Sequence, residues 1–90
     1  MKRKHVSDAI DELHAELKRT EAANANVRSH IEHLKREIEG IRAEPGEVPD
    51  QRYRQFLEPL RDSVQHFETE HLSLTLAVKR VIDALTSIGL

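Results

Sequence analysis

Cysteine is absent from this sequence, and glycine, proline and aromatic residues are scarce. Without cysteine the chain has no disulfide framework and no thiolate metal site, which suits a reducing compartment. Three glycines, three prolines, 33% charged and 38% hydrophobic residues are typical of a helical protein and not of a β-rich or disordered one. Aromatic residues make up 3%, which argues against a surface on which nucleic-acid bases stack.

Long apolar runs and an excess of one charge are also missing. No run approaches the roughly 20 residues that a membrane span needs. The formal net charge is -2, and its 14 basic and 16 acidic side chains are interspersed, so no overall field attracts DNA or an anionic membrane. The basic segment Lys2-Arg3-Lys4-His5 is followed by acidic residues and not by the apolar region of a secretory signal. We therefore expect a cytoplasmic protein that binds neither nucleic acid nor membrane.

Apolar residues recur at alternating steps of four and three along both halves of the chain. In the first half nine of eleven such positions are apolar, Thr20 and Asn24 being the exceptions. In the second half ten of eleven are apolar, His71 being the exception. We call each series a seam, because this spacing aligns the side chains along one side of an α-helix. The apolar seam residues are Val6, Ile10, Leu13, Leu17, Val27, Ile31, Leu34, Ile38 and Ile41, then Tyr53, Leu57, Leu60, Val64, Phe67, Leu74, Val78, Val81, Leu85 and Ile88.

One clear break separates the two halves. Pro45 lacks a backbone donor, Gly46 suits a left-handed turn, and Pro49 fits the first turn of a new helix. The sequence therefore predicts an all-α fold in a single helical domain. Its predicted parts are the domain 1–90, a helix over about 7–43, a turn at 44–49 and a helix over about 50–88.

The short connection predicts an antiparallel hairpin of two long helices. Each seam spans about 54 Å at ~1.5 Å per residue, and a bare pair of such helices has a thin core. Leu72, Leu76 and Ile82 lie off the seam, where a lone hairpin would leave them exposed. We expect them to form a self-association surface through which two chains build a four-helix bundle, a homodimer; a different protein partner is the alternative.

Four shorter helices in one chain are the alternative fold. The polar stretch 20–26 contains two asparagines, which disfavour helix, and three alanines, which favour it. Pro59 either kinks the second helix or marks its true start. Because both seams continue without a slip, residue patterning favours the two long helices.

The C-terminal part carries a distinctive series of residues: Phe67, Glu68, His71, Leu74, Ile88 and Gly89. This series resembles a bacterial family of small helical proteins known only as a domain of unknown function (number 4404). The stretch Leu13 to Leu17 is similar to the opening helix of that family. The resemblance implies a bacterial, cytoplasmic protein without an assigned activity. The family has prolines near Ala22 to Ala25 and at the position of Leu72, so the resemblance implies four short helices.

No set of residues typical of an active site is recognisable, so we expect no enzyme activity and no cofactor. The chain has no glycine-rich phosphate loop and no cysteine nucleophile. His30 and His33 are three residues apart on a helix and would hold a divalent ion only with ligands from a second chain. The simpler interpretation makes them exposed residues beside the seam, and we assign no metal site.

Thr20, Asn24 and His71 are the polar residues on the two seams. Antiparallel pairing brings them to one level, which predicts a hydrogen-bonded polar layer in the core that fixes register and loosens in acid. The sequence thus predicts a non-enzymatic, self-associating helical interaction or scaffold protein. The alternative is a small metal- or pH-responsive regulator that uses His71 or His30 and His33.

Overall fold

The computed structural model describes residues 2–90, so Met1 of the predicted domain lies outside the described residues. Four α-helices follow one another along this part of the chain, and no strand occurs in it. They are α1 (Lys2–Arg19), α2 (Ala25–Arg42), α3 (Asp50–Phe67) and α4 (Leu72–Ser87).

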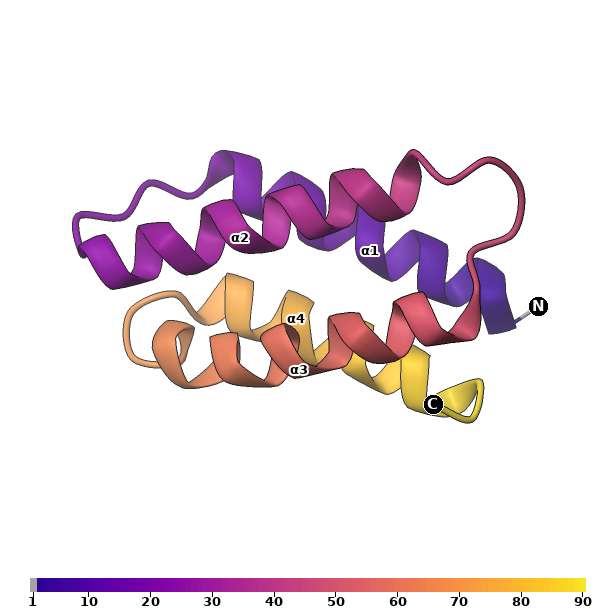
Figure 1. The fold of residues 1–90 in the computed structure, drawn as a ribbon. Helices are drawn as coiled ribbons and strands as arrows, with labels where there is room; N and C mark the ends of the chain where they lie inside the picture. The colour runs from indigo at the N-terminus through magenta and orange to yellow at the C-terminus, as the bar shows by residue number, and fades with distance from the viewer. Residues whose placement is uncertain (1) are drawn as a thin grey trace.

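The helices form an antiparallel bundle in which the chain runs up and down in turn (Figure 1). Each helix packs against two others: α1 against α2 and α4, and α3 against α2 and α4. The turns that join α1 to α2 and α3 to α4 lie at one end of the bundle, and the turn that joins α2 to α3 lies at the other (Figure 1). The described chain measures 36 × 22 × 19 Å.

The four helices correct the prediction of two long ones. The turn at the predicted position 44–49 is present, but the predicted helices over about 7–43 and 50–88 are each interrupted near the middle. The alternative of four shorter helices fits. Because each half of the chain folds back on itself, each helix packs against two neighbouring helices instead of one. Apolar side chains that a long hairpin would leave exposed to water therefore become buried.

Asn24 is the N-cap residue that precedes α2, and it marks the first interruption. Its backbone is extended, and its side-chain oxygen accepts hydrogen bonds from the backbone N–H groups of Asn26 (2.8 Å) and Val27 (3.2 Å). This is the N-cap arrangement that asparagine favours, because it satisfies N–H groups left without partners at a helix start. The hydroxyl of Thr20 donates to the Glu16 carbonyl at the other side of the break (2.7 Å).

The second interruption is the short turn between Phe67 and Leu72, which contains no proline. The His71 N–H donates to the Phe67 carbonyl (2.8 Å), which closes the end of α3. By contrast, α3 continues through Pro59. Proline is thus neither necessary nor sufficient for the helix ends in this half of the chain.

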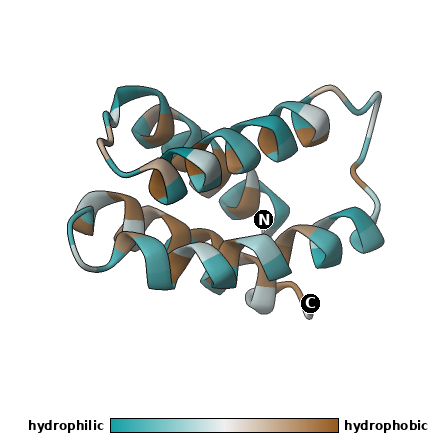
Figure 2. Ribbon diagram, turned by 60° about the vertical axis from the view of Figure 1, so that its left-hand side comes forward, coloured by the Kyte–Doolittle hydropathy of each residue, from teal (hydrophilic) through white to brown (hydrophobic). Residues whose placement is uncertain are grey.

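The core contains nearly all the apolar seam residues of both halves. Seventeen of the nineteen apolar seam residues are buried, and Val64 and Ile88 are half-buried. Off the seams, Phe56 and Ala77 are also buried, together with Ser63 and Thr75. In the ribbon of Figure 2, the brown segments of hydrophobic residues lie mainly on the sides of the helices that face one another. The spacing rule therefore identified the buried side of each helix although it did not locate the breaks.

Candidate functional site

Two large hydrophobic side chains remain exposed on α4. Leu72 is 67% exposed and Leu76 is 47% exposed, whereas six other residues of α4 are buried. The two lie one helical turn apart and therefore on the same side of the helix. We call Leu72 and Leu76, with the groove beside them, the α4 surface. Ile82 differs from them, because it is half-buried and packs against the core.

A shallow groove of about 330 Å³ continues the α4 surface toward α1. Leu76 and Ala77 of α4 line one side of it, and Ala15 lines the other. Charged side chains surround these apolar residues and form two exposed ion pairs, Arg80 with Glu12 (3.5 Å) and Arg19 with Glu16. An apolar centre within a charged border is the usual arrangement of a protein-binding surface.

The structure places Thr20, Asn24 and His71 at helix ends, and not in a layer within a continuous seam. All three lie at the same end of the bundle, near the two turns (Figure 1). Asn24 is exposed, and its side chain caps α2; Thr20 and His71 are half-buried. Because the helices break there, the hydrogen bonds of Thr20 and Asn24 go to their own helix ends and not to a neighbouring helix.

His30 of α2 and His66 of α3 stack on each other. Their ring centroids are 3.9 Å apart and the rings are inclined by 27°. Nδ1 of His30 also lies 3.5 Å from the hydroxyl of the buried Ser63. Burial lowers the pKa of His30, and His66 and, to a smaller extent, His33 lower it further, whereas Asp62 opposes this. The stack thus disfavours a charged imidazole between α2 and α3.

His33, the predicted partner of His30, is exposed. Within the described residues, no three histidine, cysteine, aspartate or glutamate side chains are placed to hold a metal ion. The helical spacing of His30 and His33 alone therefore does not assemble a ligand set in one chain.

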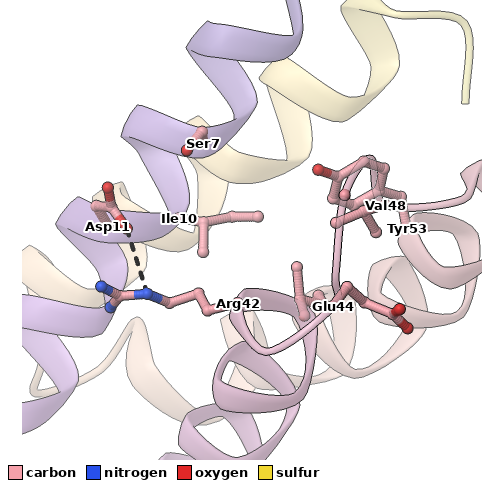
Figure 3. A pocket seen from close by; sticks show the side chains of 9 residues that line it. Ser7, Ile10, Asp11, Arg42, Glu44, Val48 and Tyr53 are labelled. Atoms are coloured by element: carbon pink, nitrogen blue, oxygen red, sulfur yellow. Dashed lines mark ion pairs between the residues drawn. The ribbon is translucent and has the colours of Figure 1, made fainter.

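A second concave region of about 320 Å³ lies where α1 faces the turn between α2 and α3. Figure 3 shows Ile10 reaching toward it from α1, with Val48 and Tyr53 on the opposite side. The Arg42 guanidinium at its edge is 3.8 Å from the Asp11 carboxylate. Arg42, the cation of this region, is therefore already paired with a carboxylate of the same chain.

Arg42 also binds His14. Its Nη1 donates to Nδ1 of His14 at 2.8 Å, since an arginine side chain has only donors. The ring proton of His14 then lies on Nε2, which faces the Glu39 carboxylate at 3.7 Å. Asp11, Arg42, His14 and Glu39 thus form a chain of polar contacts that joins α1 to α2 and is best explained as structural.

Arg3, from the basic N-terminal segment, binds the α2–α3 turn. Its guanidinium pairs with Asp50, lies 3.0 Å from the Glu47 carboxylate and lies 5.9 Å from the centre of the Tyr53 ring. The hydrogen bond to Asp50 raises the pKa of Arg3, and burial raises the pKa of Tyr53. Of the basic N-terminal segment, Arg3 therefore stabilises the fold of its own chain.

The model of the family described as "Domain of unknown function (DUF4404)" matches residues 6–90. The chain belongs to this family. No curated protein and no solved structure matches it. None of the helices described for this DUF4404 domain has the length and apolar composition to cross a membrane. The match extends over all four helices, including the α4 surface.

Sequence reasoning did not identify His66, Ser63 and His14 as residues of interest. His66 and Ser63 contact His30 only because α2 and α3 pack side by side. The length of the turn that joins α2 to α3 determines which residues of the two helices lie opposite each other. A signal was present for Asn24, because asparagine before a helical stretch is a typical N-cap.

Proposed function

We propose that this domain is a non-enzymatic helical interaction module that associates with a second copy of itself through the α4 surface. The observation that carries the proposal is the exposure of Leu72 and Leu76 on α4, whose opposite side packs into the core. The proposed role of an interaction or scaffold protein rests on this surface.

The two leucines do not contribute to the core of one chain. That core is already closed by side chains from all four helices, several of them without any exposure. Burying a leucine against a partner contributes roughly 1.5–3 kcal/mol relative to leaving it in water. Exposed apolar patches bordered by polar residues commonly mark interaction sites in soluble proteins.

The size of the patch limits the strength of the proposed association. A typical specific interface buries about 800 Å² on each partner, far more than two leucine side chains supply. The groove formed with α1 must therefore contribute, including Ala15 and the charged residues at its border. We accordingly expect association in the micromolar range and not an obligate dimer.

Leu76→Glu tests the proposal. Sedimentation of the wild-type chain over a series of concentrations should show a reversible monomer–dimer equilibrium, and Leu76→Glu should weaken it by at least tenfold, about 1.4 kcal/mol. Because Leu76 is half exposed, the variant should keep its helical content. Gln55→Glu, which places the same charge on an exposed position of α3, is the matched control and should associate as the wild type does.

A wild-type chain that stays monomeric up to millimolar concentration would refute the proposed function. A Leu76→Glu variant that associates like the wild type would refute the role of the α4 surface.

The His30–His66 stack supports a second candidate, a pH-responsive regulator. Its lowered His30 pKa gives the α2–α3 contact a dependence on acid that the interaction module does not need. This candidate uses His66 in place of His33 and His71, and its test is the pH dependence of stability described below.

A further inference from the structure

The residues on either side of the two exposed leucines carry opposite charges. Before them, in the turn that leads into α4, stand Glu68 and Glu70; after them, on α4, stand Lys79 and Arg80. All four side chains are exposed. The order along this edge is therefore acidic, apolar, basic.

We infer that the α4 surfaces of two copies pair in antiparallel orientation about a two-fold axis near the level of Leu74, which rests on the proposed self-association. This axis places Leu72 opposite the partner's Leu76, and Leu76 opposite the partner's Leu72. The two exposed leucines of each chain then cover those of the other. Self-complementary contacts of this kind are what a two-fold interface requires.

The same axis brings the charged residues together. Leu74 and Arg80 are six residues apart, about 9 Å along α4. Glu68 and Glu70 lie before the start of α4, in the turn at its N-terminal end. Antiparallel pairing therefore brings Arg80 and Lys79 toward the N-terminal end of the partner's α4, where the partner's Glu68 and the partner's Glu70 lie, at both ends of the interface. A parallel pairing would instead place acidic residues against acidic residues and basic against basic.

Most of these charges are available for a partner. Within residues 3–90, Glu68, Glu70 and Lys79 take part in no ion pair. Arg80 lies 3.5 Å from Glu12, and both side chains are about three-fifths exposed, so this contact leaves Arg80 accessible.

Charge reversal tests the pairing. The acidic swap carries Glu68→Lys and Glu70→Lys, and the basic swap carries Lys79→Glu and Arg80→Glu. Each swapped chain alone should form homodimers at least tenfold more weakly than the wild type at low salt, because like charges then face each other at both ends. An equimolar mixture of the two should form a heterodimer of near wild-type affinity, since both ends are complementary again.

Disulfide crosslinking between introduced cysteines provides a second readout, which can detect the pairing even if the substitutions weaken association. The chain has no cysteine of its own. A mixture of Leu72→Cys and Leu76→Cys chains, whose replaced residues face each other in this pairing, should form a disulfide-linked heterodimer under mild oxidation. Arg80→Cys alone should not, because the two copies of this residue would lie about 18 Å apart along the helix.

The outcomes separate this inference from the proposed function. A wild-type chain that never associates overturns both. If the wild type associates and Leu76→Glu weakens it, but the swapped chains keep wild-type affinity or their mixture gains nothing, the α4 surface is an interface with a different orientation and the inference fails. Rapid crosslinking of Arg80→Cys with itself would also overturn it.

Discussion

His30 shows how a single side chain links packing to solution conditions. Burial between α2 and α3, together with the adjacent His66 ring, disfavours its protonated form and lowers its pKa from the ordinary value of 6.5. The unfolded chain has no such restriction, so it binds a proton at this residue more readily than the folded chain does. Proton binding at His30 therefore favours the unfolded chain as the pH falls from about 6.5 through the lowered pKa of the folded chain.

We predict that the free energy of unfolding is fully maintained above about pH 6.5 and decreases as the pH falls below it, until the lowered pKa of His30 has been passed. Urea unfolding at a series of pH values measures this. His30→Gln should flatten the decrease, because its side chain does not titrate. His5→Gln, which removes an exposed histidine of α1, is the control and should retain the wild-type profile. An unchanged slope in His30→Gln would assign the acid sensitivity to other groups.

At the scale of the element, Asn24 explains why a continuous seam becomes two helices. Positions 20 and 24 keep the heptad spacing and the neighbouring alanines favour helix, so this pattern predicts one long helix although the two asparagines disfavour it. The N-cap bonds of Asn24 and the burial gained when α1 folds back against α2 together outweigh that preference. Tertiary packing of this kind is not visible in a local pattern.

We predict that Asn24→Ala lowers the free energy of unfolding by about 1 kcal/mol, because two N–H groups at the start of α2 lose their acceptor. In a chain of this size that corresponds to a decrease of roughly 4–8 °C in melting temperature. Asn26→Ala is the matched control: this exposed residue lies inside the helix and should tolerate alanine or gain slightly. Equal effects of the two substitutions would show that Asn24 does not act as a cap.

Local sequence patterns predict part of this structure but not the choice of neighbouring helices. Helical content, the buried side of each helix and the turn at 44–49 follow from spacing and from Pro45, Gly46 and Pro49. The exposure of Leu72 and Leu76 also follows, because they lie off the seam. Phe56, buried although off the seam, and the His30–His66 contact depend on which helices become neighbours, and no local pattern contains that information.

At the scale of the whole molecule, the bundle closes its core within one chain and does not need a second chain to do so. The Cα radius of gyration of 12.4 Å matches the roughly 12 Å typical of a compact domain of this length. This changes the physical basis of the proposed association. A long hairpin would need a partner to bury its core, whereas this bundle would use one only to cover the α4 surface. Reversible association of folded monomers is therefore the expected behaviour.

The most direct measurement of this claim is a concentration series of NMR spectra of the isotope-labelled wild-type chain. Between about 10 μM and 1 mM, a range that brackets micromolar association, the signals of Leu72, Leu76 and Ala15 should shift progressively. Those of His30 and His66 on α2 and α3 should stay constant. Spectra that do not change over this range, or changes that concentrate on α2 and α3 and spare α4, would contradict the account.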